Sequence, residues 1–145
     1  MVNILVCDDD KEIAGALEIY LRNEGYNVFK AYDGMEALNI VKQNQIHLIL
    51  MDVMMPNLDG IQATMKIREE NNIPIIMLSA KSEDYDKIIG LNVGADDYIT
   101  KPFNPLELIA RVKSHLRRFT RLGSMEAEGK EGIYTSGGLE VDDNE

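Results

Sequence analysis

The sequence predicts an α/β fold in which a doubly wound parallel sheet carries helices on both faces. Short apolar runs alternate five times with stretches in which apolar residues recur every three or four positions, the pattern of strands followed by amphipathic helices. The apolar runs are nearly continuous, which is typical of strands buried on both faces of a parallel sheet. Short connections and right-handed crossovers then favour the strand order 2-1-3-4-5.

The first half of the chain is expected to form three strands and two helices. The strands cover residues 3–8, 27–31 and 46–51. Asp10 is well suited to cap a helix over residues 11–23, because its side chain can accept from free main-chain N–H groups. The Asp33-Gly34 pair makes the turn into a second helix, which runs to about Gln43.

The second half is expected to add two strands and three helices. A loop over residues 53–60 leads into a helix that ends at about Glu70. Strands are expected over residues 74–78 and 97–100, with a helix over residues 85–91 between them. Proline is favoured at the first position of a helix, so Asn104-Pro105 opens a last helix, which is expected to end near Arg118.

The character of the sequence changes after Arg118. Residues 120–132 are polar, contain three glycines and lack apolar periodicity, which is the pattern of a linker. Residues 133–145 hold fragments of a further strand pair but are too few to form a core. The sequence therefore indicates a main domain over residues 1–119, a linker over residues 120–132, and either a tail or the start of a second domain over residues 133–145.

Polar side chains follow four of the expected strands at the point where each strand ends. They are the acidic run Asp8-Asp9-Asp10, Asp52, Ser79 and Lys101. Taken singly, each has an ordinary explanation as a helix cap, a turn residue or a solvated charge. Because the carboxyl ends of parallel strands meet at one edge of a sheet, the four are expected to lie together.

These residue types suit a divalent cation and a phosphoryl group. Carboxylate oxygens are the ligands that Mg²⁺ prefers in proteins. The carboxylate of Asp52 can attack phosphorus and form an acyl phosphate, a step that needs charge neutralisation more than proton transfer. The Lys101 ammonium and the Ser79 hydroxyl can both donate to phosphoryl oxygens. A cis peptide bond before Pro102 would aim the lysine inward.

Composition narrows the class of protein further. The chain has 145 residues and a formal net charge of −10, so it is not expected to bind nucleic acid unaided. Cys7 is the only cysteine and lies within an apolar run, which suits a reducing compartment. The N-terminal residues lack the pattern of a signal peptide, and no apolar stretch approaches the length of a membrane span. We therefore expect a cytoplasmic protein with no membrane partner.

Five stretches of the chain resemble the receiver domain of bacterial response regulators. They are Ile-Leu-Val-Cys-Asp-Asp-Asp (4–10), Leu-Met-Asp-Val-Met-Met-Pro (50–56), Asp-Gly (59–60), Met-Leu-Ser-Ala (77–80) and Gly-Ala-Asp-Asp-Tyr-Ile-Thr-Lys-Pro-Phe (94–103). The resemblance spans residues 1 to about 119 and implies a flavodoxin-like (βα)5 fold. It implies that Asp52 is the phosphoacceptor for a sensor histidine kinase. It also implies a Mg²⁺ site made by three side chains and one main-chain carbonyl: Asp8, Asp9, Asp52 and Met54.

The resemblance also assigns a conformational switch. Ser79 and Tyr98 take the switch positions of the family, and Lys101 takes the position that pairs with the phosphoryl group. Phosphorylation adds negative charge and strong acceptor oxygens, so Ser79 and Lys101 are expected to move toward the modified side chain. Tyr98 is then expected to swing inward, as a population shift between two existing states.

Residues 95–103 most resemble the OmpR/PhoB transcription regulators, which carry a winged-helix DNA-binding domain after a linker. Residues 137–143, Gly-Gly-Leu-Glu-Val-Asp-Asp, resemble the entry strand of that domain. The resemblance therefore implies that residues 133–145 begin a winged-helix domain that is truncated here. DNA binding would belong to the missing part.

Members of this subfamily form symmetric dimers through the fourth helix, the fifth strand and the fifth helix. The charged residues of this chain that match that face are Lys87, Asp97, Glu107 and Arg111. A two-fold interface requires self-complementary pairs of this kind, so activation is expected to promote a homodimer. One further pair is incomplete, because Asn92 stands opposite Lys113. The alternative is that these are ordinary solvated helix charges, which contribute little singly.

Other functions fit parts of the pattern. A phosphatase with an aspartyl nucleophile needs a second acid two residues on, where this chain has Met54. A flavin-binding module shares the strand order, but the acidic run would repel the flavin phosphate. A stand-alone signalling receiver without DNA output is disfavoured by the segment after Arg118. His47 and His115 have no triad or metal partner at useful spacing, so neither is expected to have a functional role. The resemblance implies a phosphoacceptor domain rather than an enzyme, with at most self-phosphorylation from small donors and self-dephosphorylation.

Overall fold

A five-stranded parallel sheet organises the residues that the computed structural model describes, 1–80 and 93–131. In chain order the elements are β1 (Asn3–Cys7), α1 (Lys11–Asn23), β2 (Asn27–Ala31), α2 (Gly34–Gln43), β3 (Leu48–Asp52), α3 (Gly60–Arg68), β4 (Ile75–Ala80), β5 (Asp97–Lys101) and α5 (Pro105–Glu131). The helix expected over residues 85–91, the segment 133–145 and the residues Lys87 and Asn92 lie outside the described residues.

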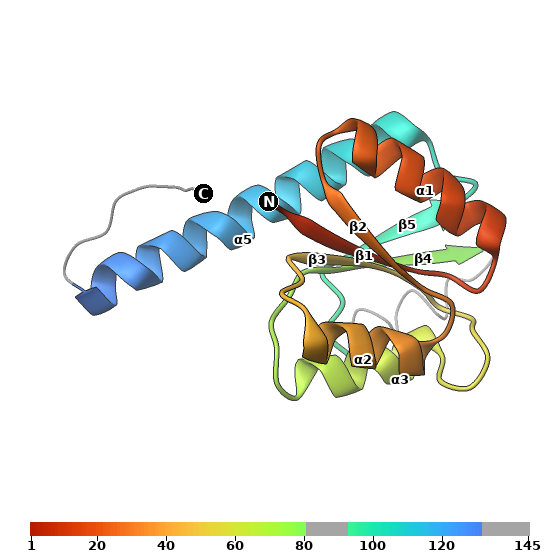
Figure 1. The fold of residues 1–145 in the computed structure, drawn as a ribbon, viewed down its shortest axis with the longest axis horizontal. Coiled ribbons are helices and arrows are strands. Elements are labelled where there is room, and N and C mark those ends of the chain that lie inside the picture. Colours follow the sequence, from red (N-terminus) through yellow and green to blue (C-terminus); the bar gives the residue numbers. More distant parts are fainter. Residues whose placement is uncertain (81–92, 132–145) are drawn as a thin grey trace.

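The strand order is β2-β1-β3-β4-β5 and every neighbouring pair is parallel, which confirms the predicted fold class. Helices α1 and α5 cover one face of the sheet, and α2 and α3 cover the other (Figure 1). The chain winds outward in both directions from the adjacent strands β1 and β3, which is the flavodoxin-like topology. The carboxyl ends of these two strands therefore lie side by side.

The core follows the two-residue period of the strands. In β1, Ile4 and Val6 belong to the apolar cluster under α1 and α5, whereas Leu5 and Cys7 belong to the cluster under α2 and α3. All four side chains are fully buried. From Ile4 to Cys7 the first strand is therefore apolar at every position, and the acidic run begins directly after it.

Aspartates begin three of the described helices. Asp10 Oδ1 accepts from the main-chain N–H groups of Glu12 and Ile13 at the start of α1. Asp33 and Asp59 cap α2 and α3 in the same way. Because these side chains satisfy N–H groups that have no partner within the helix, each cap stabilises the fold by about 1 kcal/mol. The caps also fix the short loops at the carboxyl edge of the sheet.

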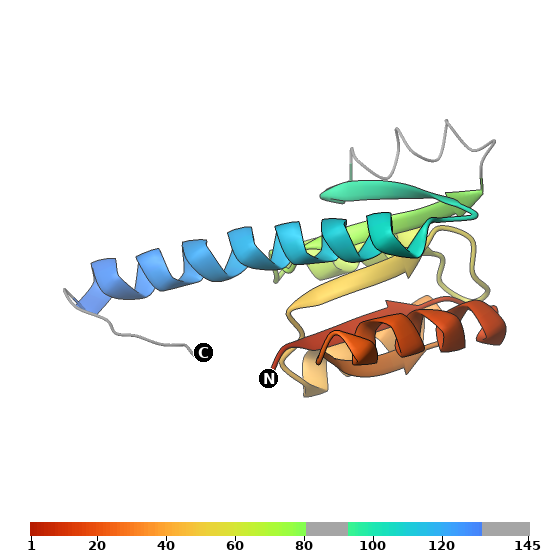
Figure 2. The same cartoon turned by 90° about the horizontal axis from the view of Figure 1, so that it is seen from above.

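Helix α5 is longer than the sequence predicted. It continues from Pro105 through Glu131, beyond the expected end near Arg118, so residues 120–131 of the expected linker are helical. The segment lacks proline and consists largely of residues with good helix propensity, and a glycine inside a helix costs only about 1 kcal/mol relative to alanine. The C-terminal part of α5 projects beyond the sheet (Figure 1 and Figure 2).

Candidate functional site

Three carboxylates meet at the carboxyl edge of β1 and β3. Asp8 and Asp9 follow β1, Asp52 ends β3, and the pairing of Cys7 with Met51 sets the two strand ends level. Each of the three acids has a carboxylate oxygen within 4.8 Å of those of the other two. Asp8 is fully buried, Asp52 is 6% exposed and Asp9 is exposed. The structure therefore brings together the acids that the sequence placed at one edge, and this acid cluster is open to solvent at Asp9.

Lys101 bridges two of these acids. Its Nζ lies 3.0 Å from Asp8 Oδ2 and 3.0 Å from Asp52 Oδ1. The lysine ends β5, which lies two strands away from β3 in the sheet, and the peptide bond before Pro102 is cis. The ammonium group thus lies within the acid cluster, whereas most lysines extend into solvent.

Negative charge accumulates in this largely buried site. The pKa of Asp52 is raised from 3.8 to about 6, chiefly by burial and further by the charges of Asp8 and Asp9, while the Lys101 ammonium opposes the rise. Burial lowers the pKa of Lys101, but its contacts with Asp52 and Asp8 outweigh this effect and raise it above its usual value. At neutral pH, three carboxylates and one ammonium leave a net charge of about −2, which a divalent cation would balance.

The two expected switch residues lie on the neighbouring strands β4 and β5. Ser79 follows Leu78, the strand partner of Asp52, and is 4% exposed. Its hydroxyl donates to the carbonyl oxygen of Ala80 at 3.3 Å. Tyr98 in β5 is 8% exposed and belongs to the apolar cluster under α2 and α3. The tyrosine ring therefore already lies inward, whereas the sequence-based hypothesis has it move inward only on phosphorylation.

The loop after β3 is anchored at both ends. The N–H of Val53 donates to Leu78 O at 3.1 Å, and the N–H of Gly60 donates to Val53 O at 2.9 Å. A Cβ added to Gly60 would collide with the main chain of Asp52, so this close return into α3 requires glycine. Met54 lies in this loop and is 67% exposed, and its role as a metal ligand through the main-chain carbonyl stays a prediction.

The charged residues of β5 and α5 contact one another within the chain. Arg111 Nη1 lies 2.7 Å from Asp97 Oδ1, and Arg111 Nη2 lies 3.1 Å from Glu107 Oε2. Three of the four residues expected on a dimer face therefore form an intramolecular network. The fourth, Lys87, lies outside the described residues.

Sequence reasoning missed the place of His115 in this network. This residue is 9% exposed, with Nε2 2.9 Å from Asp97 Oδ2 and Nδ1 3.0 Å from Arg118 Nη2. Because an arginine N–H only donates, Nδ1 is the acceptor and the Nε2–H donates to Asp97. Burial raises the pKa of Asp97, but hydrogen bonds from His115 and the N–H of Tyr98, together with the charge of Arg111, lower it below its usual range. The sequence held one signal of this network: Arg111, His115 and Arg118 are spaced by four and three residues, which puts them on one face of α5.

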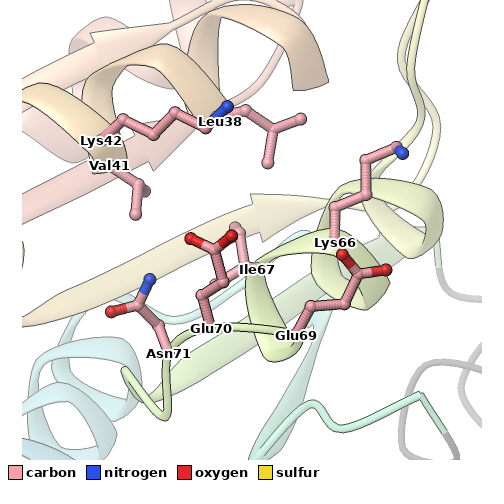
Figure 3. Close-up of a pocket in the computed structure, with 8 residues that line it drawn as sticks. All are labelled: Leu38, Val41, Lys42, Lys66, Ile67, Glu69, Glu70 and Asn71. Atoms are coloured by element: carbon pink, nitrogen blue, oxygen red, sulfur yellow. The ribbon is translucent and has the colours of Figure 1, made fainter.

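The hollows at the surface of the described residues include two that differ in their relation to the predicted site. A groove of about 160 Å³ lies between α2 and α3, and Figure 3 shows the side chains that face it. They are Leu38, Val41, Lys42, Lys66, Ile67, Glu69, Glu70 and Asn71. This groove contains none of the predicted site residues. The second hollow, of about 390 Å³, borders the acid cluster at Lys101 and is otherwise lined by Ile13, Ala80, Pro102 and Phe103.

Comparison with known proteins gives a consistent family assignment. Residues 4–113 match the family described as "Response regulator receiver domain". The chain is 48% identical over 134 residues to the "Regulatory protein VanR" of Enterococcus faecium, which covers 92% of this chain and 58% of VanR. The chain spans 48% to 59% of the length of the curated relatives compared with it.

Solved structures agree in fold. The Francisella response regulator 1452 receiver domain is 43% identical with a TM-score of 0.76, and the match covers 81% of this chain and 98% of that one. The BeF3-activated DrrB receiver domain is 36% identical with a TM-score of 0.75 and the same coverage, 81% and 98%. Across the described residues, no helix has both the length and the apolar character that a membrane span requires.

Proposed function

The chain belongs to the response regulator receiver domain family, and from this membership and the geometry of the site we propose that Asp52 accepts a phosphoryl group from a sensor histidine kinase. The observation that carries the proposal is the position of the Asp52 carboxylate. It lies beside Asp8 and Asp9 and 3.0 Å from the Lys101 ammonium. Phosphoryl transfer depends mainly on positioning and on neutralising charge, and these are the features that the site supplies.

The proposed step makes one bond and breaks one bond. An oxygen of the ionised Asp52 carboxylate attacks the phosphorus of a phosphohistidine, the P–N bond breaks, and its electron pair stays on the imidazole nitrogen. The product on this chain is an acyl phosphate. Because the pKa of Asp52 is about 6, its carboxyl group is largely ionised at neutral pH and needs no general base. Lys101 already donates to Asp52 and is placed to donate to phosphoryl oxygens as well.

The donor set of the acid cluster fits Mg²⁺. Asp8, Asp9 and Asp52 would hold the ion through hard carboxylate oxygens, and the Met54 carbonyl would add one further ligand. The raised pKa of Asp52 supports this fit, because gathering like charges in a buried site is unfavourable without a cation. When bound, the ion would neutralise the charge that the carboxylates and the phosphoryl oxygens bring together.

We place the start of the switch at the ends of β4 and β5. A phosphoryl group carries about two negative charges at neutral pH and three acceptor oxygens. The Ser79 hydroxyl and the Lys101 ammonium are the donors that would turn toward these oxygens. Both now have other partners, the carbonyl oxygen of Ala80 and the carboxylates of Asp8 and Asp52. The exchange of partners would shift the population of conformations at these strand ends.

The proposal continues to a symmetric homodimer formed by the charged face of β5 and α5, with Lys87 contributing. In the monomer, Arg111 pairs with Asp97 and Glu107 of its own chain. Replacing these pairs by the same pairs between two copies would cost little, because an exposed ion pair contributes about 1 kcal/mol or less. A modest shift at β5 would then be enough to favour the dimer, in which each residue meets its counterpart across the two-fold axis.

We also propose that the activated domain controls transcription. VanR, which resembles this chain, is named a regulatory protein, and the chain spans 58% of its length. DNA binding would belong to sequence outside the receiver, since a net charge of −10 opposes contact with nucleic-acid phosphates. The extension of α5 to Glu131 would lead toward that part, in the place of the expected linker. The lone buried thiol of Cys7 suits the reducing cytoplasm, where the proposal places the protein.

The proposal makes this domain a phosphoacceptor rather than a phosphatase. An aspartyl phosphatase needs a general acid two residues after its nucleophile, and this chain has the exposed thioether of Met54 there. The acyl phosphate on Asp52 is therefore expected to accumulate. Multiple turnover of phosphomonoesters would contradict this.

Incubation with a small phosphodonor and Mg²⁺ tests the proposal. Intact mass spectrometry should show the addition of one phosphoryl group to the wild type and none to Asp52→Ala, and chelation of Mg²⁺ should prevent the addition. Size measurement on the same samples should show a larger species only where the phosphoryl group is present. Modification of Asp52→Ala at the wild-type level would overturn the assignment.

A further inference from the structure

A hydrogen-bonded clamp joins the corner between β2 and α2 to the loop between β3 and α3. Asn57 Nδ2 donates to Asp33 Oδ2 at 2.7 Å, and the N–H of Gly34 donates to the carbonyl oxygen of Leu58 at 2.9 Å. The other oxygen of Asp33 accepts from the N–H of Glu36 at 2.8 Å. A single carboxylate therefore caps α2 and holds the neighbouring loop at the same time.

The two sides of the clamp are matched in backbone shape as well. Asn57 has a φ of 67°, in the left-handed region that asparagine and glycine adopt more readily than other residues. A Cβ added to Gly34 would collide with the main chain of Leu58. Hydrogen bonds from the N–H of Glu36 and from Asn57 hold the pKa of Asp33 below its usual value. The Asp33 side chain is thus an ionised acceptor at neutral pH, which strengthens its contact with the amide.

The clamped loop is the segment on which the proposed metal site depends. It leaves the sheet directly after Asp52 and contains Met54, whose main-chain carbonyl is the proposed ligand. The hydrogen bonds of Val53 and Gly60 anchor the two ends of the loop. The middle of the loop is held by the clamp, which lies outside the acid cluster. Because Mg²⁺ demands near-ideal octahedral geometry, a carbonyl ligand must be held in place before the ion binds well.

We propose that Asp33 and Asn57 are positioning residues for the metal site. Their hydrogen bond keeps the β3–α3 loop in the conformation in which Met54 completes the ligand set. The inference rests on the proposed function, because it concerns the same ion. Hydrogen-bonded groups behind a metal ligand commonly tune metal affinity, and these two side chains act in that way, through the loop, without touching the ion or the phosphoryl group.

The Mg²⁺ affinity of the unphosphorylated chain tests this inference. MgCl₂ is titrated while the NMR signals of the Val53 and Met54 amides are followed, for the wild type, Asn57→Gly and Asp33→Ser. Glycine keeps the left-handed backbone without the amide, and serine keeps the cap of α2 while withdrawing the acceptor from the loop. Loss of one exposed hydrogen bond should raise the dissociation constant about 2- to 5-fold in each variant. The double variant should lose no more Mg²⁺ affinity than either single variant, because the two substitutions remove the same hydrogen bond.

Asn27→Ala is the matched control. Asn27 Nδ2 donates to Asn3 Oδ1 at 3.2 Å, a comparable amide contact at the opposite edge of the sheet. Thermal unfolding of all variants separates a loss of stability from a loss of Mg²⁺ affinity. Wild-type affinity in both clamp variants, or an equal loss in Asn27→Ala, overturns the inference while Mg²⁺-dependent modification of Asp52 still supports the proposed function. A wild-type chain that binds no Mg²⁺ overturns both.

Discussion

Replacing Asp52 by asparagine is expected to stabilise the metal-free protein at neutral pH. The wild-type carboxylate is ionised there, although burial and the charges of Asp8 and Asp9 raise its pKa from 3.8 to about 6. A rise of this size corresponds to an unfavourable contribution of about 3 kcal/mol, and the opposing contact with Lys101 is already part of that balance. Asparagine has nearly the same shape and no charge, so Asp52→Asn avoids the penalty.

The gain should depend on pH in a defined direction. An acid whose pKa is raised by folding contributes stability below the unfolded-state value of 3.8 and loses it as the pH rises to about 6. Asp52→Asn should therefore match the wild type at the acidic end of this window. Above the window, its free energy of unfolding should exceed that of the wild type by about 3 kcal/mol. Urea unfolding in the presence of a chelator, followed by circular dichroism across this pH range, measures the difference.

Mg²⁺ provides a second arm of the same experiment. Addition of the ion should raise the free energy of unfolding of the wild type, because a ligand that binds only the folded state stabilises it. The difference in stability between Asp52→Asn and the wild type should therefore become smaller. Asp59→Asn is a suitable control, since asparagine also caps helices and Asp59 does not belong to the acid cluster. An equal gain at every pH, or a loss of stability at neutral pH, would refute the reasoning that the acid cluster is electrostatically unfavourable on its own.

Three other substitutions test separate contacts. Lys101→Ala removes the ammonium that lies 3.0 Å from Asp52. This change should slow modification of Asp52 by a small phosphodonor roughly 10- to 100-fold in time courses followed by intact mass. An unchanged rate would count against a role of Lys101 in phosphoryl transfer. Arg111→Glu sets a negative charge beside Asp97 and Glu107, the two acidic partners of Arg111. It should weaken the phosphorylation-dependent dimer without preventing phosphorylation. Unchanged sedimentation of the phosphorylated variant would contradict the proposed dimer face. Gly60→Ala should lower the free energy of unfolding by about 2 kcal/mol or more, because its Cβ would collide with the main chain of Asp52, whereas Gly15→Ala meets open space and should not destabilise α1.

The strand order and the meeting of the acids were predictable because both depend on residue type and topology. Continuous apolar runs identify buried parallel strands, and the neighbouring positions of the first and third strands follow from the order of the sheet. This order brings together the three acids that follow or end these strands, Asp8, Asp9 and Asp52, whatever rotamers their side chains adopt. Lys101 was predictable in the same way, since it too ends a strand of the sheet.

The finer contacts were not predictable because they depend on register and on backbone conformation. The sequence does not show that one ammonium is shared by Asp8 and Asp52, since this requires the depth of each side chain in the site. It does not show the inward position of Tyr98, which depends on packing between elements far apart in the chain. The clamp from Asn57 depends on a left-handed backbone within a loop, a feature that residue type allows but does not require.

We propose that the charge of the acid cluster links cation binding, phosphoryl transfer and the surface of α5 in a definite order. With three carboxylates and one ammonium, the site would repel an incoming phosphoryl group, so under the proposed function a cation would balance this charge before transfer. In the proposed phosphorylated form, the phosphoryl oxygens would be new acceptors for Lys101 and would weaken its pairing with Asp8. Lys101 ends the strand that Asp97 begins, and Asp97 pairs with Arg111 of α5 at 2.7 Å. We therefore expect that a shift of Lys101 at one end of this short strand would also displace Asp97, which pairs with Arg111 on the proposed dimer face.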